Sequence, residues 1–444
     1  MRLSSAAALP ATIQRPHYDR TRQKVGIVHF GIGAFHRAHQ AVYTDDAMNA
    51  GGRDWGIIGV SLRSGDVASQ LNPQDGLYTV TQKTSLAQNT RLIGAVQKVL
   101  VATEAATEII TAIAAPTTHI VSLTITEKGY QRGADGSYPG FCALLGQAFA
   151  LRKSAGLPGI TLLTCDNLSH NGVKLEALIQ SYLEAHQPTS LDWFTTHCRC
   201  PSTMVDRIVP ATSDSDRQIM GNLRDEAAVV TEPFSQWVIE DTFAGPRPQW
   251  EAGGAQFVAD VVPYETAKLR MLNGAHSALA YIGLLKGHEF VHQAIADPAI
   301  QPLIERLMLW EAAPTIAVAI GHDLSAYAAA LKDRFANSAL NHRLAQIAMD
   351  GSQKIPQRWL ETLEHNRKNG QHCPAIVSAV AAWIEYVRGD RFMVDDPKAQ
   401  ELAMLWLREG RSGVARALFG PDGVISALWS PSQQDWDSLN HQLS

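Results

Sequence analysis

The chain has few cysteines, no strong excess of charge of either sign and no long apolar run. Its 444 residues include 38 Lys and Arg against 43 Asp and Glu, which gives a formal net charge of −5. Nucleic-acid binding needs a clustered basic surface, so we expect no nucleic-acid partner. The 5 cysteines are an odd and scattered set. This argues against a disulfide framework and favours a reducing compartment.

Metal sites and membrane segments are also disfavoured. His197, Cys198 and Cys200 are close in sequence, but no second Cys/His pair at zinc spacing completes four ligands, so we expect no metal. No segment approaches the ~18–20 apolar residues of a membrane span. The apolar stretch near the N-terminus is interrupted by Pro10 and is too short for a signal peptide. We therefore expect a cytoplasmic protein with no membrane partner.

The length and the pattern of apolar residues predict two domains. A 444-residue chain exceeds the roughly 100–200 residues of one ordinary domain. Up to about residue 260, short apolar strands alternate with helices, which is typical of an α/β, doubly wound parallel sheet. Beyond it, apolar residues recur at three- and four-residue spacing, which predicts helices. We expect a Rossmann-type domain over 1–261 and a mostly α-helical substrate or catalytic domain over 262–444.

The individual elements follow from the same patterns. In the first domain, strands are expected over 25–30, 55–62, 119–126 and 159–165, and helices over 38–50, 98–115 and 141–155. In the second domain, helices are expected over 264–286, 290–296, 300–312, 324–335, 343–348, 357–365, 373–388 and 397–407.

A glycine-rich turn follows the first expected strand. Gly31 permits a tight turn, and Gly33 lets the backbone approach a pyrophosphate at the N-terminus of the next helix. His36 stands where the third glycine of G-x-G-x-x-G would be, so the motif is incomplete, and a plain strand–helix turn is the alternative. The residues predicted to contact a dinucleotide are Gly31, Ile32, Gly33, Phe35 and Arg63.

The end of the second expected strand leaves the choice of dinucleotide open. A carboxylate at this place would bind the ribose 2′-hydroxyl of NAD. Here the acid, Asp66, comes late, and Arg63 and Ser64 precede it and would suit a 2′-phosphate. We predict NAD as the cofactor, with NADP as the alternative.

Polar residues are concentrated on one apolar helix of the second domain. On a regular helix, Lys268 and His276 would project about 80° apart and lie about 12 Å apart along the axis, so both could line one face with Asn273. Buried polar groups on an apolar helix are costly, which favours a functional use. The spacing by itself is equally that of an amphipathic helix with a solvated lysine and a core histidine.

Several segments, taken in order, resemble one known family. They are GIVHFGIGAFHRAHQAVYTDDAMN, WGIIGVSLRS, NPQDGLYT, VSLTITEKGY, LTCDNLSHNG, TMVDRIVP and KLRMLNGAHS. They resemble the polyol-specific long-chain dehydrogenases, the family of mannitol 2-dehydrogenases and fructuronate (D-mannonate) reductases, from about Tyr18 to Gln357. The resemblance implies an N-terminal Rossmann-type domain, a helical C-terminal domain and zinc-independent hydride transfer.

The resemblance also implies roles for particular residues. It places a lysine base at Lys268, whose pKa must fall from its usual value near 10.4 for it to work near neutral pH. The other implied roles are oxyanion binding by Asn167 and Asn273, orientation of a hydroxyl by His276, substrate contact by Asp206 and proton release through Glu265.

The choice of substrate depends on a cation for a carboxylate. A sugar acid needs such a cation, whereas a neutral polyol does not. The segment DGSQKIPQR resembles fructuronate reductases, so D-mannonate and D-fructuronate are the first prediction. Arg343 and Lys354 are then the carboxylate ligands, and Arg358 is interpreted as a surface charge.

Other functions remain open at this point. They are a mannitol 2-dehydrogenase acting on D-mannitol and D-fructose, a sugar-phosphate dehydrogenase and, in a different class, a non-catalytic nicotinamide-binding sensor. In each case the expected partners are small molecules, and the chain is expected to be a monomer or a weak homo-oligomer.

Overall fold

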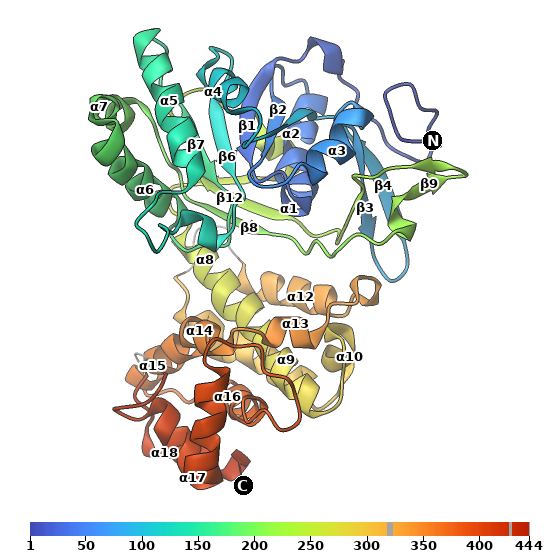
Figure 1. The fold of residues 1–444 in the computed structure, drawn as a ribbon. Helices are drawn as coiled ribbons and strands as arrows, with labels where there is room; N and C mark the ends of the chain where they lie inside the picture. Colours follow the sequence, from blue (N-terminus) through green and yellow to red (C-terminus); the bar gives the residue numbers. More distant parts are fainter. Residues whose placement is uncertain (318–322, 426–428, 444) are drawn as a thin grey trace. The chain divides into compact units, whose positions relative to one another are not determined.

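The computed structural model of the chain describes residues 1–317, 323–425 and 429–443 (Figure 1). These residues divide into two units, Met1–Val262 and Pro263–Ser444.

A five-stranded parallel sheet forms the centre of the first unit (Figure 1). Its order is β5-β2-β1-β6-β7, with β1 (Val25–Phe30), β2 (Gly56–Ser61), β5 (Val96–Val101), β6 (Ile120–Leu123) and β7 (Thr161–Thr164). From β1 the chain first adds strands on one side, β2 and then β5, and afterwards on the other side, β6 and then β7. The strand order thus reverses at β1, between β2 and β6, as it does in Rossmann-type sheets. The predicted doubly wound α/β fold is confirmed.

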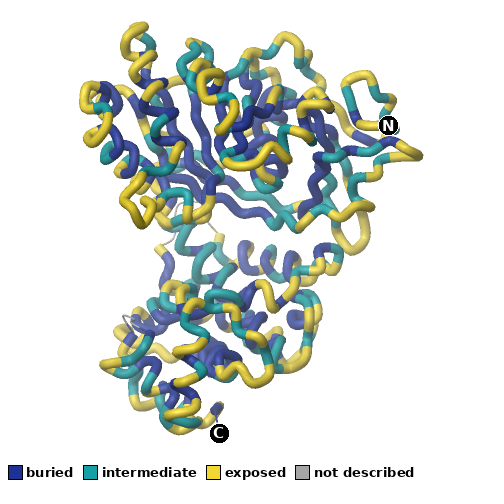
Figure 2. The backbone as a smooth tube through the Cα atoms, viewed as in Figure 1, coloured by how far each residue is buried: buried dark blue, intermediate teal, exposed yellow. Residues whose placement is uncertain are grey.

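Both faces of this sheet are buried, because successive side chains of a strand point to opposite faces. Ile27 contributes to one apolar cluster, which includes residues of α2 (Gln40–Asn49), and Val28 contributes to the other, which includes residues of α5 (Gly140–Ser154). Figure 2 shows the sheet as largely buried backbone. The other helices of this unit are α1 (Ala34–Ala38), α3 (Asp66–Leu71), α4 (Ala106–Ala114), α6 (Asn171–His186) and α7 (Pro188–His197).

The helix expected over 98–115 is wrong in its first part. Val96–Val101 is the edge strand β5, which pairs with β2, and the helix α4 begins only at Ala106. The run Val99, Leu100 and Val101 is buried throughout, so it lacks the alternation that would mark a strand. Only the pairing with β2, which is distant in sequence, decides its conformation.

Smaller sheets in the first unit were not predicted. Their strands are β3 (Tyr78–Lys83), β4 (Gln88–Ile93), β8 (Thr203–Asp206), β9 (Gln218–Met220), β10 (Leu223–Arg224), β11 (Val229–Thr231), β12 (Gln236–Glu240) and β13 (Gln256–Val258). They form the sheets β11-β3-β4, β13-β12-β8 and β10-β9. The pairing of β3 with β11 joins segments that are far apart in sequence, which a local pattern cannot predict.

From Val262 onward the described chain is helical, so the predicted helical C-terminal domain is confirmed. The helices are α8 (Val262–Ala267), α9 (Gly274–Leu285), α10 (Val291–Ala296), α11 (Gln301–Arg306), α12 (Leu324–Phe335), α13 (Leu344–Ala348), α14 (Gly351–Ile355), α15 (Glu361–Lys368), α16 (Pro374–Tyr386), α17 (Ala399–Phe419) and α18 (Gln433–Leu443). α17 runs past the expected end at 407 and bends at Gly410, and α18 was not predicted. None of the helices in the described ranges is both long and apolar enough to cross a membrane.

Candidate active site

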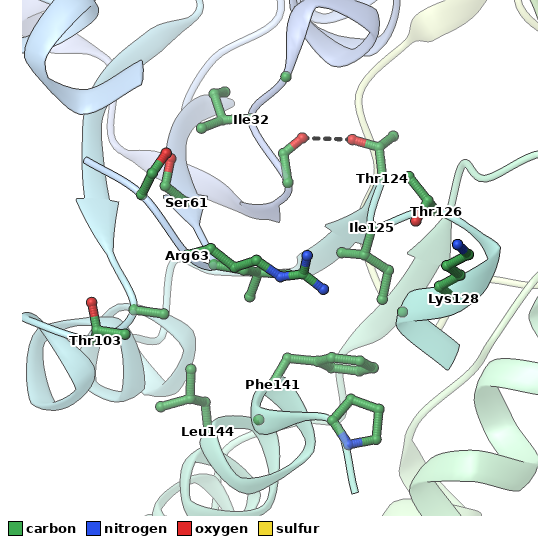
Figure 3. A pocket seen from close by; sticks show the side chains of 18 of the residues that line it. Ile32, Ser61, Arg63, Thr103, Thr124, Ile125, Thr126, Lys128, Phe141 and Leu144 are labelled. Carbon is green, nitrogen blue, oxygen red and sulfur yellow. Dashed lines mark hydrogen bonds between the residues drawn. The ribbon is translucent and has the colours of Figure 1, made fainter. Parts of the chain in front are cut away.

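A pocket of about 730 Å³ opens at the carboxyl ends of the central strands of the first unit (Figure 3). Residues 31–33 after β1, 61–64 after β2 and 124–126 after β6 line it. The strand order reverses between β2 and β6, and open α/β sheets bind ligands at this position. The pocket therefore lies where a Rossmann-type sheet holds a dinucleotide.

The glycine turn is held in a conformation that only glycine tolerates. Gly31 has φ +91°, and a Cβ there would lie 2.0 Å from the carbonyl oxygen of Thr124. Thr124 Oγ1 donates a hydrogen bond to the Gly31 carbonyl at 2.7 Å. The backbone can thus approach a pyrophosphate closely, as the motif requires.

His36 replaces the third glycine of the motif and is packed in the core. Its ring stacks on that of His29, with 3.4 Å between the ring centroids. His29 in turn contacts Ser122 Oγ at 2.8 Å and Thr124 Oγ1 at 2.9 Å. Burial lowers the pKa of His29 to about 3 and holds the pKa of His36 well below its usual value. Both rings are therefore neutral at physiological pH and brace the turn.

Four of the five residues predicted for the dinucleotide line the pocket. They are Gly31, Ile32, Gly33 and Arg63. The fifth, Phe35, is not among the lining residues, and its ring stacks on His39 at 5.1 Å. Phe35 thus packs beside the turn, on the helix that follows it.

The charged side chains of the pocket are both positive. Arg63 and Lys128 line it, and among its described lining residues there is no carboxylate. Asp66, the late acid of the second strand, lies exposed in the first turn of α3 and is not part of the lining. Sequence reasoning did not select Lys128, although it lies in the TITEKGY segment that follows a strand beside the reversal point.

A buried carboxylate fixes one wall of the pocket. Asp166 accepts hydrogen bonds from the backbone of Ile125 at 2.9 Å and Thr126 at 2.8 Å, and from Tyr130 Oη at 2.6 Å. Burial raises the pKa of Asp166, and these three hydrogen bonds oppose that rise. Thr126 has φ +67° and ψ 164°, a conformation that costs a non-glycine residue about 1–3 kcal/mol. The three hydrogen bonds hold the wall in this strained form.

The two substrate-side residues predicted in the first unit lie at the ends of β7 and β8, which belong to different sheets. Asn167 is exposed after β7, and Asp206 is buried at the end of β8. Asn171 connects these segments, because its Nδ2 donates to the carbonyls of Asp166 at 3.1 Å and Thr203 at 2.8 Å. The loop that carries Asn167 is thereby fixed to the start of β8.

In the second unit, the helix that carries Lys268 is not regular. Lys268–Asn273 forms a π-helical turn between α8 and α9, in which the N–H of Gly274 donates to the carbonyl of Leu269, five residues back. The angle and spacing expected for a regular α-helix are therefore wrong for this segment, because a π-turn contains an additional residue. Glu265, Lys268 and Asn273 are half-buried.

Arg270 anchors the π-helical turn. Its Nη1 donates to the carbonyl of Thr315 at 2.9 Å and to Thr315 Oγ1 at 2.8 Å. Its Nη2 lies 3.5 Å from a carboxylate oxygen of Glu361. Arg270 thus connects the π-helical turn to one segment before α12 in the sequence, at Thr315, and to one after it, at Glu361.

His276 is buried among aromatic and cationic groups. Its ring centroid lies 4.7 Å from that of Phe335 and 5.4 Å from that of His342. Burial, with smaller contributions from His342, Arg334 and Arg358, lowers the pKa of His276 well below its usual value. Its Nε2 has no hydrogen-bond partner among the described residues. A neutral imidazole with one unsatisfied buried nitrogen is suited to bind a hydroxyl group of a ligand.

The two predicted carboxylate ligands have different surroundings. The guanidinium of Arg343 lies 2.7 Å from Glu289, its side chain is 58% exposed, and it lies over the ring of Phe290. Lys354 is half-buried, and its Nζ donates to the carbonyl of Met349 at 2.6 Å. Of the two, Lys354 is the less exposed.

Arg358 is not the surface charge that the sequence suggested. It is half-buried, and its Nη1 donates to Ser277 Oγ at 2.7 Å and to the carbonyl of Asn273 at 3.4 Å. Local sequence offered no signal for this contact, since 81 residues separate Arg358 and Ser277.

Potential metal ligands do not gather. Across residues 1–317, 323–425 and 429–443 there is no group of three or more His, Cys, Asp or Glu side chains placed to hold a metal. Cys198, in the segment considered above, is buried, and burial raises the pKa of its thiol to about 11.

A Rossmann-type unit with a pocket at its reversal point, followed by a helical unit with Lys268, Asn273 and His276 on one helix, defines a dinucleotide-dependent dehydrogenase. More specifically, the chain belongs to the mannitol dehydrogenase family. The mannitol dehydrogenase Rossmann domain matches residues 25–252, and the mannitol dehydrogenase C-terminal domain matches residues 260–418.

Individual members of the family are similar along most of the chain. D-mannonate oxidoreductase of Escherichia coli (strain K12) is 38% identical over 93% of this chain and 91% of that protein. Mannitol 2-dehydrogenase of Pyricularia oryzae is 36% identical over 88% of this chain and 85% of its own. The structure of Pseudomonas fluorescens mannitol 2-dehydrogenase with NAD and D-mannitol is 33% identical, covers 100% of this chain and 96% of its own, and has a TM-score of 0.83.

Proposed function

We propose that this protein transfers a hydride between NAD(H) and an acyclic sugar derivative, interconverting a secondary alcohol and its 2-ketose. The first proposed pair is D-mannonate and D-fructuronate. The observation that carries the proposal is the helix on which Lys268, Asn273 and the unsatisfied, buried His276 follow one another, in a chain whose other unit holds a dinucleotide-type pocket. The similarity to a D-mannonate oxidoreductase over nine-tenths of the chain supports the choice of substrate.

The residues of the first unit fit a dinucleotide. The turn at Gly31 and Gly33 can approach a pyrophosphate through its backbone, since a Cβ at Gly31 would clash with the Thr124 carbonyl, and Arg63 lines the same pocket. A bound nicotinamide supplies the hydride acceptor or donor. We assign these residues to holding the cofactor.

The lysine of the second unit fits proton transfer, and residues of both units are assigned to the substrate. As the base, Lys268 takes the proton of the reacting hydroxyl in oxidation and returns it in reduction. The amide of Asn273 is assigned to donate a hydrogen bond to that oxygen as it gains negative charge, and the amide of Asn167, in the first unit, is assigned the same role. His276 binds a neighbouring hydroxyl through Nε2, Asp206 binds another, and Glu265 passes the proton to solvent.

The substrate carboxylate is assigned to Lys354, with Arg343 as the second ligand. Lys354 is half-buried on α14, where an ammonium group is partly desolvated and binds an anion more strongly. Arg343 can take part only by leaving Glu289, with which it forms an exposed ion pair. This ion pair favours the second candidate, a mannitol 2-dehydrogenase, in which no carboxylate needs Arg343.

We also place the protein in the cytoplasm, as a monomer or a weak homo-oligomer. All five cysteines are free thiols, which is what a reducing compartment maintains. Sedimentation velocity across a range of concentrations tests the oligomeric state.

The experiment that tests the function is a panel of ketoses with NADH and with NADPH, followed by the loss of nicotinamide absorbance. Rapid turnover of D-fructuronate but not D-fructose supports the hexuronate reductase. The reverse result supports the mannitol 2-dehydrogenase, and turnover of a phosphorylated ketose alone would contradict both. Dinucleotide binding without turnover of any of these ketoses would favour the nicotinamide sensor.

A further inference from the structure

Two consecutive side chains of another π-helical turn contact the end of the turn that carries Lys268 and the start of α9. Pro356–Leu360 is π-helical, as Lys268–Asn273 is, and the two turns pack against each other. Arg358 lies half-buried on this second turn, and Trp359 is completely buried. Trp359 and Gly274 are 85 residues apart in sequence, so the packing of the two turns belongs to the tertiary fold.

The contacts fall on the point where the catalytic helix returns from π-helical to α-helical hydrogen bonding. Trp359 Nε1 donates to the carbonyl of Gly274 at 3.1 Å. Arg358 Nη1 donates to the preceding carbonyl, that of Asn273, at 3.4 Å and to Ser277 Oγ at 2.7 Å. A change from five-residue to four-residue hydrogen bonding alters which carbonyls have a partner within the helix. Two side chains thus donate to successive carbonyls at this junction.

We propose that Arg358 and Trp359 form a clamp that fixes the π-helical register of the catalytic helix. Arg358 and Trp359 are then positioning residues for Lys268, Asn273 and His276, and they need not touch the substrate. This inference rests on the proposed function, which assigns the chemistry to those three side chains.

The register matters because Lys268 lies at the start of the π-turn and His276 lies beyond its end. A π-turn holds one residue more than an α-helical turn. If the turn reverted to α-helix, every side chain after it would rotate by about 100° and shift by about 1.5 Å relative to Lys268. A base and its hydrogen-bonding partners could not then meet on one substrate carbon, since even about 1 Å of misplacement costs about 100-fold in rate.

The surroundings of His276 link the same clamp to electrostatics. The charged or titratable groups that face its ring are Arg334 of α12, His342 before α13 and Arg358. The Arg358 guanidinium therefore has two effects, one on helix register and one on the neutral form of the imidazole. Burial lowers the pKa of His276 more than Arg358 does, so the imidazole stays neutral without the guanidinium, and the loss expected on its removal is that of the helix register.

The test compares Arg358→Ala, Arg358→Lys and Trp359→Phe in the full-length protein. We expect Arg358→Ala to lower kcat by about 10- to 100-fold while the Kd for NADH changes less than about threefold. Added guanidinium ion, at concentrations far below those that unfold proteins, should restore part of the lost kcat. Lysine presents a point charge and not a planar fork, so Arg358→Lys should recover little. Trp359→Phe retains the ring and loses only the N–H donor, so it should lower kcat by a smaller factor.

Hydrogen exchange gives a readout that does not depend on activity. Amide exchange of residues 268–277 should become faster in Arg358→Ala and in Trp359→Phe, with exchange in the first unit unchanged. Unaltered exchange of residues 268–277 in both variants, or a kcat for Arg358→Ala within about twofold of wild type, would overturn the clamp. If the wild-type protein turns over none of the ketoses, the proposed function fails, whereas exchange still decides whether the clamp exists. If Arg358→Ala does not fold, Trp359→Phe carries both measurements.

Discussion

His29 is a core residue that is connected to the glycine turn by hydrogen bonds. Its two ring nitrogens contact Ser122 and Thr124, and Thr124 in turn binds the carbonyl of Gly31. The interior holds the ring neutral, because burial lowers the pKa of His29 to about 3 from a usual value of 6.5. A single buried histidine therefore couples the packing of the sheet to the shape of the dinucleotide turn.

This burial predicts a particular dependence of stability on pH. The unfolded chain binds a proton at His29 near pH 6.5, and the folded chain binds it only near pH 3. The contribution to stability is complete above about pH 6.5 and is lost progressively as the pH falls toward 3. At about pH 5 the loss from this one group is about 2 kcal/mol.

The variant His29→Gln, which cannot titrate, should lose less stability than wild type between neutral pH and about pH 5. Urea unfolding at the two pH values measures the difference, with the exposed His17→Gln as control. An identical loss in wild type and in His29→Gln would contradict the buried neutral ring.

Arg63 is the residue through which the choice of dinucleotide can be tested. It lines the pocket together with Lys128 and without a carboxylate among the described lining residues. A hydrogen bond to a charged group contributes about 1.5–3 kcal/mol, so loss of Arg63 should raise the KM for NADPH by about 10-fold or more. The KM for NADH, which lacks the 2′-phosphate, should change by less than about threefold.

Steady-state kinetics of Arg63→Ala with both dinucleotides make this comparison, and Lys128→Ala serves as the matched variant from the opposite side of the reversal point. An equal rise of both KM values in Arg63→Ala would show that the guanidinium contacts a part common to the two cofactors.

At the scale of elements, the loop between β6 and the next 3-10 turn depends on Asp166. Three hydrogen bonds converge on its buried carboxylate, and they hold Thr126 in a left-handed conformation. Asp166 is followed in the chain by Asn167, which is proposed to polarise the substrate oxygen. The carboxylate thus shapes the pocket wall and the start of the Asn167 loop at the same time.

Asp166→Asn should disturb both segments, because an amide has one acceptor oxygen and its NH2 group would face a backbone N–H. Leaving one buried donor unsatisfied costs about 1–3 kcal/mol. We expect a lower melting temperature together with a fall in kcat. Tyr130→Phe, which removes a single donor from the same carboxylate, should show a smaller loss of both. An Asp166→Asn protein with unchanged kcat and melting temperature would contradict this role.

Elements with a clear local pattern could be predicted from the sequence. The strand over 25–30 and the helix over 324–335 agree with β1 and α12 at both ends. β1 is a short apolar run that ends at a glycine turn, and α12 begins directly after Asp323, whose side chain caps it. β5 could not be predicted, since its buried run fits a helix as well as a strand until β2 pairs with it. The π-helical turn at Lys268–Asn273 could not be predicted either, because its composition is that of an ordinary apolar helix. The contacts that Arg270 and Arg358 make at this turn are with residues far away in sequence.

The candidate site likewise has a part that the local sequence predicted and a part that it did not. The position of Gly31 after a strand predicted the pocket, because that chemistry depends on a local turn. The surroundings of Arg343 and Arg358 could not be predicted, since both depend on partners far along the chain, Glu289 for the one and Ser277 for the other.

At the scale of the whole molecule, the dinucleotide-type pocket and the proposed base belong to different units. The pocket residues all precede Val262, whereas the proposed base and its partners Asn273 and His276 follow it. Cofactor binding and proton transfer should therefore respond separately to substitution. A single change at the base should remove turnover and leave dinucleotide binding intact.

The measurement that tests this most directly is the kcat of Lys268→Ala, determined beside its Kd for NADH by fluorescence titration. The control is Lys286→Ala, an exposed lysine at the end of α9. We predict that Lys268→Ala loses about 100- to 10,000-fold in kcat, the usual contribution of a general acid–base, and binds NADH within about threefold of wild type. A variant that turns over its ketose at the wild-type rate would contradict the assignment of Lys268 as the base, and with it the account of the second unit.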